Sequence, residues 1–172
     1  MVKKVLPWSL IVIVAGMGIL WVLGERTYSY STTTTIAAPP ERVWASLTEK
    51  DKLLLWIEGL KSSTPVATDG LRVGAKSVET IEKNGQLFNM ESEIVRLEPP
   101  RAMEIRFVMA GAGIVEARYE LTTNGSRTRV SLKEDEQSQG WFRLFAPFIG
   151  AEIQGQLDRD IVKWKDVVEK DK

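Results

Sequence analysis

The chain of 172 residues contains no cysteine and no histidine. Without cysteine it has no disulfide, no thiolate nucleophile and no cysteine–zinc site. Without histidine it has no histidine general base, no histidine-based triad and no histidine metal ligand. Any catalysis would depend on carboxylates, lysine, tyrosine, serine, threonine or bound water. Because no acidic calcium-binding loop occurs either, we predict no metal and no cofactor.

An excess of charge of either sign is also absent. The 23 basic residues balance the 23 acidic ones, so the formal net charge is zero. Nothing is available to neutralise a phosphate backbone, which argues against a nucleic-acid partner. The length allows one domain with a sizeable core. The oligomeric state is left open.

One long apolar run stands at the N-terminus. Residues 5–23 carry no charge, with Trp8 and Trp21 near the two ends of the run and Lys3 and Lys4 before it. At about 1.5 Å per residue, such a helix just crosses a hydrocarbon core about 30 Å thick. We therefore predict a transmembrane anchor at 1–26 and a second domain at 27–172. The preceding lysines favour a single-pass protein with a cytoplasmic N-terminus and an extracytoplasmic domain.

Two other interpretations of this run compete with a retained anchor. A cleaved signal peptide could use Val22 and Gly24 as a weak cleavage site, but its apolar region is usually only about 7–15 residues long. A helix buried in a soluble core would be expected to show a polar face, which this run lacks. The retained anchor is the preferred interpretation.

Behind the run, the sequence predicts a strand, two short helices and a series of further strands. Residues 28–36 are β-branched and aromatic, as is typical of a strand. A double proline then opens a short helix with Val43, Trp44 and Leu47 on one face, and a second helix is predicted at Lys50–Trp56. Turn signals separate five more strands, predicted near residues 74–82, 87–97, 102–109, 114–122 and 127–134.

Alternation is clearest in the strand at 102–109. Met103, Ile105 and Phe107 share one face, while Glu104 and Arg106 lie on the other. Such a pattern predicts an antiparallel meander with one dry and one solvated face. The strand at 74–82 alternates too poorly for its faces to be assigned.

The C-terminal segment is predicted to be one long amphipathic helix. Its apolar positions recur at spacings of three and four, at Phe145, Ile149, Ile153, Leu157, Ile161, Trp164 and Val168. Pro147 and Gly150 are expected to break or kink its start. One apolar helix face and one apolar sheet face cover each other, so the fold class is α+β.

This order of elements, together with several short motifs, resembles the START-like or SRPBCC superfamily, and most of all its polyketide cyclase/dehydrase-type branch. The likeness lies in IAAPPERVW at 36–44, Trp56, Val73-Gly74, LEPPR at 97–101 and YEL at 119–121. It covers about residues 28–170. The resemblance implies a helix-grip fold, in which an antiparallel sheet wraps around the long C-terminal helix, here preceded by one transmembrane helix.

The resemblance also implies a cavity between the sheet and the last helix that takes apolar or amphipathic ligands. The superfamily shares no single catalytic constellation, so we assign no catalytic residue and lean away from an enzyme. The cavity candidates are the inward positions of the strands and of the last helix, together with Trp56: Trp56, Phe88, Met90, Met103, Ile105, Phe107, Met109, Tyr119, Ile153 and Leu157. Ordinary core packing would use the same residue types.

Two further groups of residues have alternative interpretations. Glu79, Glu91 and Glu93 lie on solvated sheet faces in the preferred interpretation, but a cavity-facing one would have a raised pKa and could act as an acid or base. In the segment 140–150, the residues Trp141, Phe142, Arg143, Phe145 and Phe148 could close the cavity mouth or dip into a bilayer interface. In the preferred interpretation they cover the end of the core, because aromatic-rich helix starts are common there.

Three hypotheses for function follow. The first is a membrane-tethered, non-catalytic binding module for a hydrophobic or lipid-like small molecule. The second is a cyclase- or dehydratase-type enzyme acting on a hydrophobic substrate, which requires a buried carboxylate or Tyr119 beside the cavity. The third is a protein-interaction domain that reuses the fold, with a solid core and an exposed apolar patch.

Overall fold

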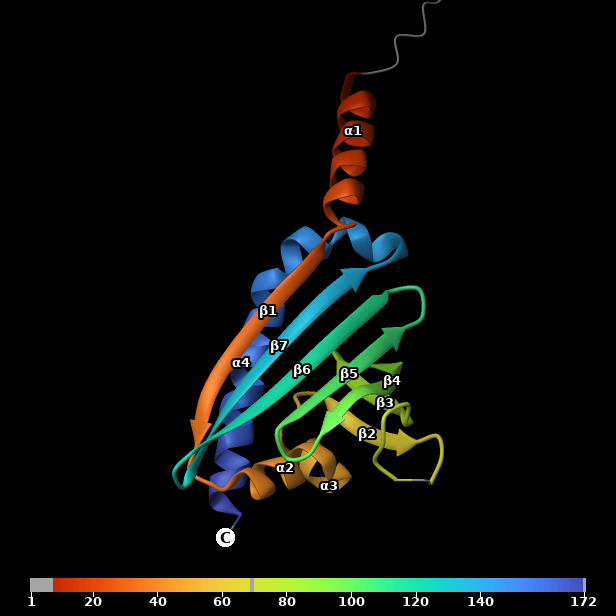
Figure 1. Ribbon diagram of the computed structural model, residues 1–172. Coiled ribbons are helices and arrows are strands. Elements are labelled where there is room, and N and C mark those ends of the chain that lie inside the picture. Colours follow the sequence, from red (N-terminus) through yellow and green to blue (C-terminus); the bar gives the residue numbers. More distant parts are fainter. Residues whose placement is uncertain (1–7, 69, 172) are drawn as a thin grey trace, which may run out of the picture.

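A seven-stranded antiparallel sheet forms the centre of the computed structural model, which describes residues 8–68 and 70–171. The strands are β1 (Thr27–Ile36), β2 (Leu60–Pro65), β3 (Lys76–Lys83), β4 (Gln86–Glu98), β5 (Ala102–Met109), β6 (Gly113–Asn124) and β7 (Arg127–Ser138). Their order across the sheet is β1-β7-β6-β5-β4-β3-β2. Strands β3 to β7 form the predicted meander, β2 extends it at one edge, and β1 pairs with β7 at the other (Figure 1).

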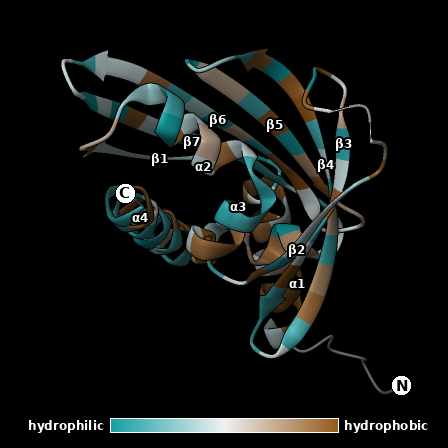
Figure 2. Cartoon of the chain, turned by 90° about the horizontal axis from the view of Figure 1, so that it is seen from below, coloured by the Kyte–Doolittle hydropathy of each residue, from teal (hydrophilic) through white to brown (hydrophobic). Residues whose placement is uncertain are grey.

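The helices lie around this sheet. They are α1 (Trp8–Leu23), α2 (Pro40–Thr48), α3 (Lys50–Trp56), the short 3-10 helix η1 (Gly140–Leu144) and α4 (Ala146–Lys170). Figure 2 shows the sheet curving around α2, α3 and α4. The α+β class, the antiparallel sheet and the long C-terminal helix are therefore confirmed.

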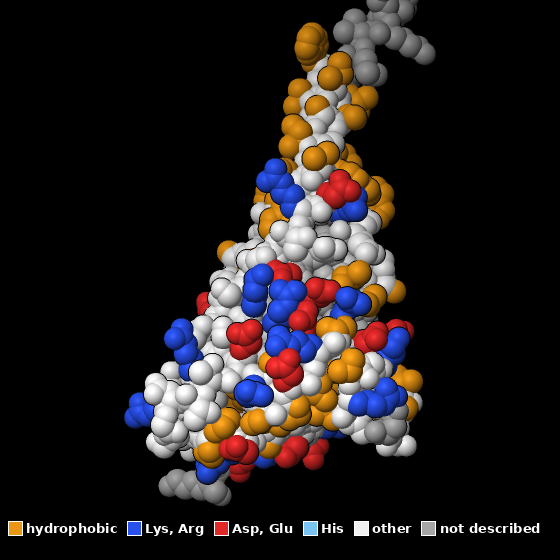
Figure 3. All heavy atoms as spheres, in the orientation of Figure 1, with side chains coloured by type: hydrophobic (Ala, Val, Ile, Leu, Met, Phe, Trp, Pro, Cys, Tyr) orange, Lys and Arg blue, Asp and Glu red, His pale blue; other side chains and the backbone are white. Residues whose placement is uncertain are grey.

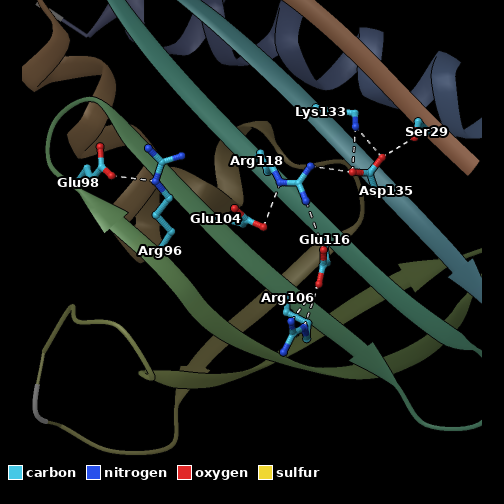
Figure 4. Close-up of polar contacts among 9 residues, drawn as sticks. All are labelled: Ser29, Arg96, Glu98, Glu104, Arg106, Glu116, Arg118, Lys133 and Asp135. Atoms are coloured by element: carbon cyan, nitrogen blue, oxygen red, sulfur yellow. Dashed lines mark hydrogen bonds and ion pairs between the residues drawn. The ribbon is translucent and has the colours of Figure 1, made fainter. Parts of the chain in front are cut away.

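The outer face of the sheet carries a network of charges (Figure 4). Arg118 forms ion pairs with Glu104 at 3.0 Å, with Asp135 at 2.8 Å and with Glu116 at 3.4 Å. Glu116 also pairs with Arg106 at 3.0 Å. The predicted solvated face is thus correct, and Figure 3 shows these charges gathered over the middle of the molecule. Exposed pairs of this kind contribute only about 0–1 kcal/mol each, so they keep this face soluble more than they stabilise the fold.

The inner face of the sheet packs against α4 to form the core. Val130 and Leu132 of β7 and Trp164 and Val168 of α4 are at most 2% exposed. Burial of these apolar side chains is the main stabilising contribution that holds α4 against the sheet.

Two local predictions need correction. Strand β2 was not predicted, because its sequence LKSSTP shows little apolar alternation, and it is an edge strand paired only with β3. Pro147 does not break α4: it occupies the first turn of the helix, where its missing N–H is not needed. Gly150 lies within the helix and faces β1. A Cβ atom there would lie 3.1 Å from the Tyr30 hydroxyl, so glycine allows α4 to approach β1 closely.

The N-terminal helix α1 projects from the end of the domain (Figure 1), and its apolar side chains are largely exposed (Figure 3). It has 16 residues, which corresponds to about 24 Å of helix. Within residues 8–68 and 70–171, no helix combines the length and apolar character needed to cross a bilayer. The predicted transmembrane helix, and with it the single-pass localisation with a cytoplasmic N-terminus and an extracytoplasmic domain, is therefore wrong.

The prediction counted the apolar run as one helix from residue 5, whereas the helix that the structure describes is Trp8–Leu23. Lys3, Lys4 and the first residues of the run lie outside the described residues. The proposed domain boundary between residues 26 and 27 stays a prediction.

Candidate functional site

A cavity of about 240 Å³ lies between the inner face of the sheet, α3 and α4. Its walls are predominantly apolar. Besides residues that the sequence indicated, it is lined by Leu47, Leu53, Ile57, Leu60, Ile81, Val115 and Leu132. The lining residues come from strands β2 to β7 and from α2, α3 and α4, around which the sheet curves (Figure 2).

Six of the ten predicted cavity residues line this space: Trp56, Met90, Ile105, Phe107, Tyr119 and Leu157. The other four do not. Met103 is packed in the core at 3% exposure, and Met109 and Ile153 are half-buried beyond the cavity. Phe88 lies near the β3–β4 hairpin turn and is 36% exposed. Alternation along a strand gives the face of each residue, but it does not give how far along that face the cavity extends.

An aromatic cluster adjoins the cavity, and two of its members, Trp56 and Tyr119, line it. The rings of Trp56 and Trp164 stack with centroids 4.7 Å apart, and Tyr119 meets Trp164 edge-on at 6.0 Å. Ser46 joins the pair, because its hydroxyl accepts from Trp164 Nε1 at 2.6 Å and its carbonyl accepts from Trp56 Nε1 at 3.0 Å. With both indole N–H groups satisfied, the cluster holds α2, α3 and α4 together as a rigid wall.

Glu79 lies on the inner face of β3 and lines the cavity. It is 9% exposed and accepts hydrogen bonds from the hydroxyls of Ser63 at 3.1 Å and Ser92 at 3.0 Å. Burial raises the pKa of Glu79, and the two serines oppose that shift. The preferred interpretation of a solvated face is therefore wrong for Glu79. Glu91 is exposed, and Glu93 pairs with Lys76 at 3.5 Å.

Two further carboxyl groups, Glu134 of β7 and Asp160 of α4, line the same cavity and were not predicted. Burial raises the pKa of Glu134 to about 7, with the charges of Asp160 and Glu136 adding to the shift. Burial likewise raises the pKa of Asp160 to about 6, although Asp160 Oδ1 accepts the backbone N–H of Glu58 at 2.9 Å. Both groups can therefore change protonation near neutral pH.

Tyr119 points its polar end towards the same region. Its side chain is 6% exposed and lines the cavity. Burial and the charges of Glu134 and Asp160 raise the pKa of its hydroxyl, which stays protonated at neutral pH. Within residues 8–68 and 70–171, neither the Tyr119 hydroxyl nor the Glu134 carboxyl group makes a hydrogen bond or ion pair. In the same part of the chain, no group of three or more acidic side chains is placed to hold a metal ion.

The predicted lid residues lie elsewhere. Trp141, Phe142, Phe145 and Phe148 are between 49% and 71% exposed, and none lines the cavity. Arg143 faces α1 instead: its guanidinium lies 5.4 Å from the centre of the Trp21 ring and pairs with Glu25 at 3.5 Å. A role for these residues in closing the cavity or contacting a surface stays a prediction.

Comparison with known proteins shows similarity in family and fold. The family model described as polyketide cyclase/dehydrase and lipid transport matches residues 27–169. No curated protein matches the chain. Among solved structures, protein CV1439 from Chromobacterium violaceum has a TM-score of 0.64 at 17% identity, with 83% of this chain and 99% of that chain covered.

Two further structures are similar to the same degree. TTHA0849 from Thermus thermophilus has a TM-score of 0.64 at 18% identity, with 83% of this chain and 95% of that chain covered. A protein from Arthrobacter aurescens has a TM-score of 0.66 at 18% identity, with 83% and 86% covered. At these identities the likeness shows the fold alone.

Proposed function

The chain belongs to the polyketide cyclase/dehydrase and lipid transport family, and from this premise we propose that it binds a small hydrophobic molecule in the cavity between the sheet and α4. The apolar cavity of about 240 Å³ is the observation that carries the proposal. Ligand pockets combine predominantly apolar walls with a few polar groups, as this cavity does. Its volume is below the about 300–1,000 Å³ of drug-sized pockets, which favours a small ligand or the end of a larger one.

Uptake of a neutral dye tests this proposal. N-phenyl-1-naphthylamine fluoresces strongly in apolar surroundings, and we expect the purified full chain to bind it saturably. Native mass spectrometry of the same preparation should show either a co-purified small molecule or uptake of an added one. If neither measurement detects a ligand, binding in the cavity is ruled out as the function.

Filling the cavity should prevent uptake. Ile105 on the inner face of β5 lines the space, and Ile105→Trp places a larger side chain there. We expect the affinity for N-phenyl-1-naphthylamine to fall at least about tenfold. A tenfold loss corresponds to about 1.4 kcal/mol, which is within the about 1–3 kcal/mol that overpacking a filled space typically costs. The measurement is a fluorescence titration, with thermal melting as a check on folding.

A matched control comes from the same strand. Val108 lies on the opposite face of β5 and is 40% exposed. Val108→Trp introduces the same side chain outside the cavity, so the dye affinity should stay within about twofold of the native chain. Equal losses in the two variants would place the dye somewhere other than the cavity.

A second candidate function is supported by the ionisable groups. Glu134, Asp160 and Tyr119 line the cavity, and the raised pKa values of Glu134 (to about 7) and Asp160 (to about 6) suit general acid–base catalysis near neutral pH. An enzyme of dehydratase type would remove a proton from a hydrophobic β-hydroxy ketone and protonate the departing hydroxyl. Elimination can be followed by the ultraviolet absorbance of the enone product.

Under this second candidate, Glu134→Gln should reduce the elimination rate by at least about a hundredfold, the contribution typical of a positioned acid or base. A native chain no faster than the uncatalysed reaction over a series of such ketones would remove the enzymatic candidate.

The third hypothesis, a protein-interaction domain, required a solid core. The cavity argues against it, although exposed Trp141 and Phe148 would suit an interaction surface.

A further inference from the structure

Carboxyl groups are the only charged groups among the described residues that line the cavity. Glu79, Glu134 and Asp160 contribute them, and no lysine or arginine of residues 8–68 and 70–171 lines the space. The Glu79 carboxyl group is already bonded to two serines, whereas Glu134 has no such bond within that part of the chain. Its nearest charged influences are Asp160 and Glu136, both of the same sign.

The cations that act on these carboxyl groups lie outside the cavity lining. Arg159 and Lys163 act electrostatically on Asp160 from outside the cavity. The Arg159 guanidinium is more than half exposed and pairs with Glu58 at 2.8 Å. Lys50 influences Glu79 in the same indirect way. The negative charge of Glu134 and Asp160 is therefore only weakly compensated by the protein.

Tyr119 provides a second, independent sign of a ligand. Its side chain is more than nine-tenths buried, lines the cavity and leaves its hydroxyl without a hydrogen-bond partner among the described residues. The buried side-chain polar atoms without a partner in this part of the chain are the Tyr30 hydroxyl and Arg143 Nε, so the Tyr119 hydroxyl is accessible from the cavity and open to a hydrogen bond with a polar ligand group. Trp56, Phe107 and Tyr119 also present aromatic rings to the cavity, and such rings attract cations.

On the premise that the cavity binds a ligand as proposed above, we propose that this ligand is a hydrophobic amine whose protonated nitrogen lies against Glu134 and Asp160, beside the Tyr119 hydroxyl. An ammonium group has three donors and no acceptor, which matches two carboxylates and a phenolic oxygen. The apolar remainder of the ligand contacts the apolar walls. A carboxylate or phosphate at this place would instead be repelled by two like charges in a poorly solvated space.

Three ligands of equal chain length test this assignment. Octylamine, octanol and octanoate differ only in the charge of the head group, and their affinities for the full chain can be compared by isothermal titration calorimetry at about pH 8, where Glu134 is mostly ionised. We expect octylamine to bind at least roughly tenfold more tightly than octanol. A tenfold difference corresponds to about 1.4 kcal/mol. The attraction between opposite charges about 4 Å apart near a protein surface is about 4 kcal/mol, which leaves room for the cost of desolvating them. Octanoate should bind more weakly than octanol.

Conservative variants identify the groups responsible. Glu134→Gln and Asp160→Asn keep the size of each side chain and remove its charge. In the double variant the preference for octylamine over octanol should fall to within about twofold. The control Glu120→Gln removes an exposed negative charge from β6 outside the cavity and should leave the preference intact.

Proton release gives a readout that needs no variant. Near pH 7 Glu134 is partly protonated, and a cation bound beside it lowers its pKa, so binding of octylamine should release a fraction of a proton. Binding enthalpies measured in phosphate and in Tris buffer should therefore differ for octylamine and agree for octanol. Equal behaviour of the two ligands would overturn the proposed amine position.

The outcomes separate the two proposals. If octanol and the neutral dye bind but octylamine is not preferred over octanoate, the amine assignment fails and hydrophobic ligand binding stands. If none of the three C8 ligands and no dye binds, both proposals fail together. Tighter binding of octylamine, lost in the double variant, supports both.

Discussion

Replacing Trp164 with alanine is expected to lower the free energy of unfolding by about 3–5 kcal/mol, the usual cost of removing a fully buried tryptophan. The side chain is 0% exposed, stacks on Trp56 and contacts Tyr119 edge-on. Its removal leaves a void next to an existing cavity and strips the Ser46 hydroxyl of its donor at 2.6 Å. Since domains are stable by only about 5–15 kcal/mol, a large share of the total would be lost.

Urea unfolding monitored by far-ultraviolet circular dichroism measures this loss. Trp164→Phe keeps an aromatic ring but removes the N–H group, so it should cost less than alanine, with about 1–2 kcal/mol attributable to the lost hydrogen bond. Trp141→Ala is the matched control, because Trp141 is 71% exposed and should change stability by less than about 0.5 kcal/mol. A loss of under about 1 kcal/mol in Trp164→Ala would show that the helices do not depend on this cluster.

The fold could be predicted largely because its elements carry strong local patterns. Alternation in β5 identified the dry and solvated faces, and the apolar stripe of α4 predicted a helix that covers the sheet. Strand β2 escaped prediction because an edge strand with serine at its inward position Ser63 has no apolar alternation to recognise. The membrane span was predicted from the length of an apolar run, and among residues 8–68 and 70–171 no helix is long and apolar enough to cross a bilayer.

The site was only partly predictable, although two missed residues had a signal. Glu134 continues the inward face of Val130 and Leu132 at a spacing of two. Asp160 lies three residues after Leu157 and therefore on the apolar face of α4. A carboxyl group at such a position contradicts the pattern, and the contradiction itself indicates a functional site. The volume left between these faces depends on how side chains pack, which no periodicity describes.

The second large effect concerns pH. Burial raises the pKa of Glu134 to about 7 in the folded chain, whereas a glutamate in an unfolded chain has a pKa of about 4.3. Between these values the folded state binds more protons than the unfolded state, so the contribution of Glu134 to stability falls as pH rises through this window. Above about pH 7 the folded chain carries the full cost of a buried charge. Below about pH 4.3 the cost is absent, because both states are protonated.

Glu134→Gln should therefore stabilise the protein more at high pH than at low pH. We expect a gain of about 1–3 kcal/mol at pH 8.5, less than the full shift would allow at about 1.36 kcal/mol per pKa unit, because the carboxyl group is only partly shielded from solvent. At pH 5 the folded glutamate is protonated and resembles glutamine, but the unfolded one is mostly ionised, so the gain should fall to at most about 1 kcal/mol. Comparing the variant with the native chain at each pH cancels the titration of groups that do not interact with Glu134. Asp160 and Glu136 do interact with it. Loss of the Glu134 charge makes their ionisation easier, which also stabilises the variant at high pH.

Urea unfolding of the native chain and of Glu134→Gln at pH 5 and pH 8.5 gives the four free energies of unfolding that test this prediction. Glu120→Gln, on an exposed position of β6, shows how much of any change comes from the reduced net charge of the molecule. Its gain should be small and similar at the two pH values. If Glu134→Gln were equally stabilising at pH 5 and pH 8.5, the Glu134 carboxyl group would not be held neutral by its surroundings. The cavity would then lack the protected negative charge on which recognition of an amine depends.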